Sequence, residues 1–421
     1  MRNISFLVIF VLLSLYLDAQ NIDDQYDKSD YFRSSWHNVL VHHSDQKYAD
    51  EIIYTYNIRP RTDKFNDHSI SADLIAVSGK DYVKLAKIDK YIETNDVAKE
   101  LVAKWFNRNE DDGCCDMGLI YRRGIEGATT ENIETSELTK RGRSILQDCG
   151  TDLIGNTFVL VHDIIYIDKA ERNKKTAEGI GVVGSLLKDL GEVVAEVTGE
   201  EAFEDLGSAF DDLSKTTADL VDDFEGFRVK IQTHLYRLDW QPSYSDIFFE
   251  NYYLDANYYD EDKYKSWENA EYQLVYIGTQ EAVCGKTVLA GIYNQSDLIK
   301  KVIYRTLDES IVKLQKNYEV FRIKEPIYSI DSEGNVIAKI GLKEGISDNS
   351  KFEVIERIEA SDGTIKYKRL GVIQPNPDKI WDNRYMAVEE GAVNADLEGT
   401  TFSVVSGHGF YPGLLIREIR F

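Results

Sequence analysis

Runs of β-branched and aromatic residues, bounded by turn-forming residues, predict strands in the first two thirds of the chain. In the run FRVKIQTHLYRLDW, inward and outward positions alternate cleanly, as they do in a strand with one buried face. We expect strands at 51–60, 71–77, 117–124, 156–167, 227–240 and 270–278.

Apolar residues at helical spacing predict helices between these strands. One helix is expected over 94–108, with Thr94 or Asn95 as its cap. Another is expected over 136–150, closed by Gly150. The buried face of the first helix would consist of Val97, Leu101, Val102 and Trp105.

The clearest helical period in the chain covers 296–321. Asn294 or Ser296 is its expected cap. Its apolar stripe would consist of Leu298, Val302, Ile303, Leu307, Ile311, Leu314 and Tyr318.

Residues 171–226 also have helical spacing of apolar residues, but glycines are interspersed among them. Between positions 200 and 225 there are ten acidic residues and one basic residue, Lys215. We expect a helical hairpin that is inserted between two strands and packs on the body by one face. Membrane insertion is the alternative. Charged side chains interrupt the apolar run that this alternative needs: Lys188, Asp189 and Glu192.

From Pro326 to Phe421 the pattern changes to short alternating strands, separated by Gly, Asp and Asn turns, with no helical period. We expect a small β-barrel or sandwich. The final LLIREIRF would be its closing strand. Such an ending is also typical of outer-membrane barrels, but those need at least eight strands, and this chain uses much of its length for helices.

The predicted fold is therefore α+β: a central sheet with packed helices and a helical insert, followed by a small C-terminal β-barrel or sandwich domain. The length of the chain also favours more than one domain. The expected boundaries are 1–19 for a signal peptide, 20–93 for an N-terminal mixed β region, 94–325 for an α/β core with the insert 171–226, and 326–421 for the C-terminal β domain.

The N-terminus has the features of a secretory signal peptide. Arg2 precedes an apolar run from Ile4 to Leu17 that is too short to cross a bilayer comfortably. We expect cleavage near Ala19 or Gln20, with an uncleaved anchor as the alternative. No later apolar segment has transmembrane length. The sequence thus predicts an exported protein of the periplasm or outer membrane surface, with the cell exterior as an alternative.

Export would place the four cysteines in an oxidising compartment. Adjacent Cys114 and Cys115 could close only a strained ring with each other, so each would have a distant partner or stay free. Cys149 and Cys284 are the available partners, and the pairing stays open. The chain has no C-x-x-C spacing, which disfavours a thiolate metal site.

The formal net charge of −24 limits the classes of partner. A strongly negative chain repels nucleic-acid phosphates and anionic lipid head groups. We therefore expect no nucleic-acid binding, whereas basic partners and divalent cations remain open.

The segment YIGTQEAVCGKT ends in the letters that close a phosphate-binding loop. Such a loop needs G-x-x-x-x-G-K-[ST], but the glycine before Gly285 is Gly278, and Gln280 occupies the required position. The next predicted helix also starts too late to direct its N-terminus at a phosphate. We therefore interpret Lys286 as a turn lysine.

The segment VHHSD places His42 beside His43, with His37 nearby and His68 further along the chain. Neighbouring side chains on a strand point to opposite faces, so His42 and His43 could not chelate one ion without a bend. We interpret these residues as solvent-exposed histidines.

The segment 250–267 is rich in acids and tyrosines and is expected to be a surface connection. Asp255, Asn257, Asp260 and Asp262 hint at Ca²⁺. Asp260, however, occupies the position where an EF-type loop has Gly, so a solvated loop is favoured. Its aromatic residues could instead form a platform for sugar or peptide, with ordinary packing as the favoured reading: Tyr252, Tyr253, Tyr258, Tyr259 and Trp267.

Two further constellations are read as structural. Ser406 and His408 have no G-x-S-x-G elbow and no marked orienting acid, so we expect a turn. In IWDNRY (Trp381, Asp382, Asn383, Arg384) we expect a corner in which Arg384 pairs with a neighbouring carboxylate. No catalytic, cofactor-binding or metal-binding residue is therefore predicted.

Parts of the chain resemble known families. LIYRRG…SELTKRGRSILQDCGTDLIGNTFVLVHDIIY is similar in order to envelope proteins of the curli-secretion and flagellar-assembly types. IAKIGLKEGISDNSKFEVIERI…LGVIQPN resembles the small barrel of flagellar-assembly proteins, where G-x-x-x-G-[IV] precedes a hydrophobic strand. Through LVAKWFNR, LIGNTFVLVHD, LYRLDW, IWDNRY and YPGLLIR, the chain as a whole resembles a family of exported bacterial proteins without an assigned activity. The resemblance carries over no catalytic residues.

These observations favour a non-enzymatic binding or assembly protein of the bacterial cell envelope, with other envelope proteins as partners and no cofactor. The alternative is a secreted glycan-binding protein or hydrolase that uses the acidic, Tyr-rich surface. Paired carboxylates about 5–10 Å apart in one cleft would mark the hydrolase. The ligand and the oligomeric state stay open at this point.

Overall fold

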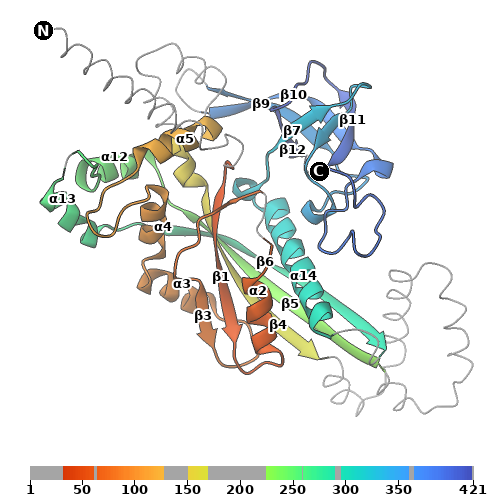
Figure 1. The fold of residues 1–421 in the computed structure, drawn as a ribbon, viewed down its shortest axis with the longest axis horizontal. Coiled ribbons are helices and arrows are strands. Elements are labelled where there is room, and N and C mark those ends of the chain that lie inside the picture. Colours follow the sequence, from red (N-terminus) through yellow and green to blue (C-terminus); the bar gives the residue numbers. More distant parts are fainter. Residues whose placement is uncertain are drawn as a thin grey trace, which may run out of the picture.

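A computed structural model of the protein describes residues 32–60, 64–127, 150–168, 224–257, 259–289, 295–359 and 365–419. The architecture is α+β, as predicted. Helices pack on a central mixed sheet, and a closed six-stranded barrel follows towards the C-terminus (Figure 1). Of the two alternatives for the C-terminal region, the barrel is therefore the correct one.

The strands of the central sheet are, in spatial order, β2 (Asn66–Asp67), β1 (Ser35–His43), β4 (Thr157–Asp168), β5 (Phe224–Leu238) and β6 (Leu274–Leu289), and β3 (Leu74–Val77) also pairs with β1. β1 runs parallel to β2, β3 and β4, whereas β5 is antiparallel to both β4 and β6. The strands predicted at 71–77, 156–167, 227–240 and 270–278 are confirmed.

The helices that cover the sheet are α2 (Ala49–Asn57), α3 (Leu85–Thr94), α4 (Val97–Trp105) and α14 (Gln295–Asn317). α2 and α14 pack on one face around Leu40, Ile164 and Val229. α3 and α4 pack on the opposite face around Val39 and Val161. β1 and β4 are consequently buried on both faces, which is why β4 is almost continuously apolar.

An aromatic cluster joins further helices to one end of the sheet. Phe106, just after α4, stacks on Phe248 with ring centroids 3.9 Å apart, and Trp267 lies edge-on to Phe248. The helices concerned are α5 (Met117–Gly127) and α12 (Pro242–Asn251), and α13 (Glu261–Ser266) lies directly before Trp267. Short 3₁₀ helices are η1 (Leu153–Asn156), η2 (Trp267–Asn269), η3 (Glu319–Phe321), η4 (Leu342–Glu344) and η5 (Pro377–Lys379).

The barrel strands are β7 (Glu325–Ile330), β8 (Val336–Ala338), β9 (Phe352–Glu359), β10 (Ile365–Pro375), β11 (Thr400–Ser406) and β12 (Leu415–Glu418). They close in the order β10, β11, β8, β7, β12, β9 around a core that includes Val336, Phe352 and Phe402. β12 pairs with both β7 and β9. The final segment is therefore the closing strand of the barrel, as expected.

Two predicted strands are helices. Residues 51–60 lie largely in α2, where Ile52 and Tyr56 are four residues apart and share the buried face. Residues 117–124 lie in α5, whose first turn is held by Asp116, because its carboxylate accepts from Leu119 N at 2.9 Å. Tertiary packing overrides the strand propensity of β-branched and aromatic residues. The overlooked signal was the acidic residues at the two helix starts.

β1 was not predicted, although it is a central strand of the sheet. β6 was predicted too short, since it pairs with β5 over its whole length. Lys286 therefore lies within β6, opposite Phe227, and the interpretation as a turn lysine is wrong. Gly278 accompanies a bulge in this ladder, and a Cβ there would collide with the Tyr318 ring.

The helices predicted at 94–108 and 296–321 are confirmed as α4 and α14. The whole predicted stripe of α4 is buried, but its N-cap is Asp96 rather than Thr94 or Asn95. The stripe of α14 is buried or half-buried throughout.

The predicted insert falls outside the described residues up to position 223, and residues 224–226 belong to β5. Residues 136–149 of the other expected helix also lie outside them. In the parts of the chain that the structure describes, none of the helices is long and apolar enough to span a membrane.

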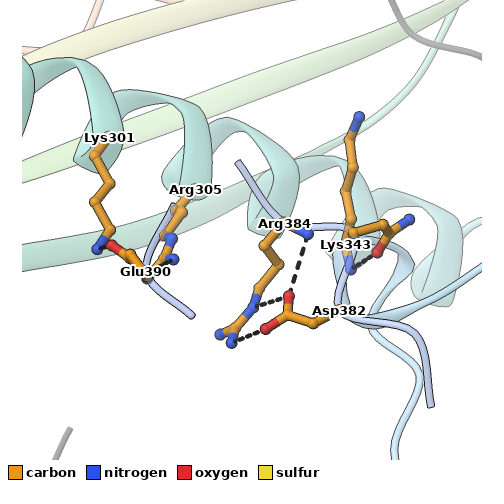
Figure 2. A network of polar contacts seen from close by, with 7 residues as sticks. Lys301, Arg305, Lys343, Asp382, Arg384 and Glu390 are labelled. Carbon is orange, nitrogen blue, oxygen red and sulfur yellow. Dashed lines mark hydrogen bonds and ion pairs between the residues drawn. The ribbon is translucent and has the colours of Figure 1, made fainter. Parts of the chain in front are cut away.

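The connection between β10 and β11 docks on α14 (Figure 2). Glu390 binds both Lys301 and Arg305, with 2.8 Å between Glu390 Oε2 and Arg305 Nη2. Tyr385 lies edge-on to Tyr304 with ring centroids 4.6 Å apart. These contacts hold the barrel against the helical face of the sheet.

We expect Glu390→Gln to lower the free energy of unfolding by about 1 kcal/mol, because two largely covered cations of α14 lose their shared carboxylate. Chemical denaturation measures the change. Glu389→Gln is the matched control, since Glu389 is exposed and makes no ion pair among the described residues. Equal destabilisation by the two variants would show that Glu390 does not hold the barrel.

Candidate functional site

A cleft of about 880 Å³ opens between the central sheet and the barrel. The start of β1, α2, segment 64–69 and α14 line the sheet side, and η4 with the connection after β10 lines the barrel side. Aromatic rings in its walls belong to Trp36, Phe65, Tyr304 and Tyr385. This volume is typical of sites for small organic ligands.

A chain of hydrogen bonds leads from the cleft into the core. His162 lies between Asn38 and Thr233, with 3.1 Å from Nε2 to the Asn38 side chain and 2.9 Å from Nδ1 to Thr233 Oγ1. Thr233 lies 2.9 Å from Ser310 Oγ, which donates to the Leu307 carbonyl. The chain thus links β1, β4, β5 and α14 through buried polar groups.

The direction of this chain follows from the charge of His162. Burial, followed by the Arg59 charge, lowers the pKa of His162 to about 3, so its ring is neutral and has one donor and one acceptor. His162 Nε2 lies 3.1 Å from Asn38 Oδ1, which only accepts, so Nε2 carries the ring proton and donates to Asn38. Nδ1 of the neutral ring then accepts from the Thr233 hydroxyl.

Beside the cleft, the buried Tyr56 hydroxyl and His68 Nδ1 have no hydrogen-bond partner among the residues that the structure describes. Both residues line the cleft, and each is 3% exposed. Burial raises the pKa of Tyr56 to about 12. Burial, with Arg123 and Lys104 nearby, lowers the pKa of His68 to about 3. Both are therefore neutral hydrogen-bonding groups at neutral pH.

The cleft is an exception to the negative charge of the chain, which has 73 acidic and 49 basic residues. Basic side chains slightly outnumber acidic ones in its lining, and burial raises the pKa of Glu344, which favours its neutral form. The basic residues are Arg59, Lys64, Lys104, Arg123 and Lys343, and the acidic ones are Asp67, Asp73, Asp308 and Glu344.

Arg59, Lys104 and Lys343 have no carboxylate within ion-pair distance in the described part of the chain. Arg59 lies over the Tyr56 ring, 3.9 Å from its centroid, and donates to the Tyr56 carbonyl. Figure 2 shows the Lys343 side chain extending away from Asp382. These three cations are available to a negatively charged ligand.

The histidines are not solvent-exposed, contrary to the prediction. His37, His43 and His68 are buried, and His42 is half-buried. The physical reason is that helices and loops cover both faces of β1. His37 donates from Nε2 to the Ala72 carbonyl at 2.9 Å, and burial lowers its pKa.

His43 forms a buried ion pair with Asp163. His43 Nε2 lies 2.6 Å from Asp163 Oδ1, and both side chains are almost fully buried. His43 Nδ1 donates to the Gly79 carbonyl at 3.0 Å, and Asp163 Oδ2 accepts from Val83 N at 2.7 Å. Burial alone would lower the pKa of His43, but the hydrogen bond and charge of Asp163 outweigh it and raise the pKa. Both ring nitrogens donate, so the ring is an imidazolium that anchors the loop before α3.

The acidic segment 250–267 does not bring its carboxylates to one ion. Asp260 caps α13 by accepting from the backbone of Asp262 and Lys263, and Asp255 accepts from Asn257 N. Across the described ranges, no group of three His, Cys, Asp or Glu side chains is placed to hold a metal ion.

The aromatic residues of the same segment are largely engaged in packing. Tyr252 lies edge-on to the buried Trp267, with ring centroids 5.7 Å apart, and Tyr253 belongs to the same cluster. Tyr259 is 56% exposed, and Tyr258 lies outside the described residues.

The two remaining constellations have structural roles or none. Ser406 and His408 are exposed where β11 ends. Arg384 pairs with Asp382 at 2.9 Å, as expected, and although burial opposes it, this contact lowers the pKa of Asp382. Asn383 accepts from the Lys343 backbone, which ties the corner beside Trp381 to η4.

Cys114, Cys115 and Cys284 are free thiols, and Cys149 lies outside the described residues. Burial raises the pKa of Cys115 and of Cys284 to about 11, so both stay protonated at neutral pH.

Of the cleft residues, the sequence had drawn attention only to His68 and to those near the IWDNRY corner. Tyr56 lies in α2 and Arg59 comes two residues after this helix, in a segment that was predicted as a strand. Lys343 lies in η4, between two strands of the barrel. One signal was present: IRPRTDK, residues 58–64, is a basic stretch in an acidic chain.

The chain matches no model of a known protein family, and no curated protein is significantly similar to it. The site therefore has to be interpreted from its own geometry.

The His43–Asp163 pair predicts a pH-dependent stability. A histidine whose pKa is raised on folding stabilises the folded state fully at pH values below its pKa in the unfolded chain, which is about 6.5. This contribution is lost as the pH rises through the pKa of the histidine in the folded state. We expect the free energy of unfolding, measured by urea denaturation, to fall on the alkaline side of neutrality. His43→Gln should remove this pH dependence, whereas the exposed-site control His408→Gln should retain it.

Asp163→Asn should lower the free energy of unfolding by about 3–5 kcal/mol, since a buried imidazolium loses its counter-ion. Unfolding near pH 6 and near pH 9 measures both effects. An unchanged pH slope in His43→Gln would rule out the charged pair.

Proposed function

We propose that the protein is a non-enzymatic binding protein of the bacterial cell envelope and that the cleft between sheet and barrel is its ligand site. The observation that carries the proposal is that the buried Tyr56 hydroxyl and His68 Nδ1 have no partner within the described ranges of the chain. Leaving such a group unsatisfied costs about 1–3 kcal/mol. A ligand that supplies the missing hydrogen bonds accounts for both atoms at once.

Binding is favoured over catalysis by the state of the two histidines in the cleft, because burial lowers the pKa of both His68 and His162 to about 3 and makes them weak bases. Both ring nitrogens of His162 are occupied by protein groups, Asn38 and Thr233. A general base needs a nitrogen within reach of a substrate proton. His162 is therefore suited to shaping the cleft rather than to proton transfer.

The envelope assignment is supported by the sequence. The N-terminal segment with Arg2, the apolar run and Ala19 is typical of exported proteins. The resemblance to envelope assembly proteins supports the same compartment. The alternative, a glycan-binding surface on segment 250–267, is less favoured because Trp267 and Tyr252 are packed against each other.

If the Tyr56 hydroxyl forms a hydrogen bond with a ligand, Tyr56→Phe should raise the stability of the empty protein and weaken ligand binding. The empty protein should become more stable by about 1 kcal/mol, because a buried hydroxyl without a partner is removed. Retention of small molecules that copurify from envelope extracts should fall. Denaturation and native mass spectrometry measure the two effects.

Tyr54→Phe is the matched control, since Tyr54 lies on the same helix and is 65% exposed. It should change neither property. Destabilisation by Tyr56→Phe, with ligand retention unchanged, would mean that the hydroxyl has a purely structural role.

Export predicts a mature protein that begins near Gln20 and is found in the periplasmic or outer-membrane fraction. Cell fractionation with mass spectrometry of the N-terminus tests this. Intact protein in the cytoplasm with Met1 retained would contradict the envelope assignment.

A further inference from the structure

We propose that the cleft binds a short acidic saccharide, a hydroxylated sugar chain with more than one negative group. This inference rests on the proposed function and names the ligand class of the same site. It is drawn from the charges, the neutral polar atoms and the aromatic rings that line one cavity.

The charges select for an anion. Arg59 and Lys104 line the sheet side of the cleft and Lys343 lines the barrel side, and none has a carboxylate at ion-pair distance in the described ranges. Two of the acidic lining residues are already engaged, since Asp67 accepts from Ser69 and Glu344 accepts from Asn383. Cations on both sides fit separate negative groups along one ligand better than a single small anion.

The neutral polar atoms select for hydroxyl groups. The Tyr56 hydroxyl can donate or accept, and the neutral His68 ring offers one donor and one acceptor. A sugar hydroxyl both donates and accepts, so it satisfies either atom whichever role that atom takes. A carboxylate alone could not do so, because it only accepts.

The size and walls of the cleft select for a ring-shaped ligand longer than a single small acid. Tyr385 is half-buried and lies edge-on to the buried Tyr304, so it provides apolar ring surface against which the C–H face of a sugar can pack. A cleft of about 880 Å³ is large for a monosaccharide and is within the range of drug-sized ligands.

The test is isothermal titration of the full chain with trigalacturonate and trimannuronate. Fully methyl-esterified trigalacturonate is the matched ligand control, since it keeps the rings and hydroxyls and loses the charge. Tricarballylate is the opposite control, a polyanion without sugar hydroxyls. We expect at least one charged saccharide to bind about tenfold or more tightly than both controls, with an affinity that falls as salt is raised.

Variants locate the binding. Lys104→Gln and Lys343→Gln should each weaken the affinity about tenfold, which corresponds to about 1.4 kcal/mol. Lys90→Gln is the matched control, because Lys90 is an exposed lysine on α3 that does not line the cleft. It removes the same charge and should leave the affinity unchanged.

The outcomes separate the two proposals. If the methyl ester binds as well as the acid, and Tyr56→Phe weakens both, the cleft is a binding site but the ligand class is wrong. If tricarballylate binds as well as the saccharides, the hydroxyl part is wrong. If a saccharide binds and neither lysine variant nor Tyr56→Phe changes its affinity, the site lies elsewhere and both proposals fail. If no charged saccharide binds, the acidic-saccharide proposal is overturned, and the Tyr56→Phe experiment on copurified ligands still tests the cleft.

Discussion

β1 and β4 lie at the centre of a sheet that helices cover on both faces, so bulk water does not reach their polar side chains. Buried polar side chains of this kind are satisfied mainly by other groups of the protein. The successive residues His162 and Asp163 point to opposite faces and meet different partners. On the α14 face His162 stays neutral, and on the α3 face Asp163 keeps His43 charged. The burial of the two strands on both faces thus leaves His162 neutral and His43 charged.

The same constraint explains the cleft. α14 covers the sheet and also carries the barrel through Lys301 and Arg305, so the wall of the cleft is built from both parts of the chain. A second ion pair joins the two parts of the chain, with 2.9 Å between Lys64 Nζ and Glu325 Oε1 at the start of β7. Residues that are far apart in sequence are therefore held at one cavity by ion pairs that join the two parts of the chain.

The architecture could be predicted where local patterns decide the structure. The strands at 156–167 and 227–240, the long helix and the β-rich C-terminal region have clear periods, and each is confirmed. β1 was missed because His37, Asn38 and His43 break its apolar pattern, although they are buried. The cleft could not be predicted, since it depends on which distant segments meet. Tyr56 and Lys343 are brought together by the docking of the barrel, which no local pattern encodes.

The barrel closes through β12, the last strand of the described chain, which fits between β7 and β9. While the ribosome is still synthesising the chain, β7 and β9 have unpaired edges, and such edges readily bind other strands. The turn that carries Lys343 lies between those two strands in the sequence. The barrel side of the cavity therefore depends on a strand that follows both of its neighbours in the sequence, and a polypeptide lacking β12 would have an open barrel beside an intact sheet.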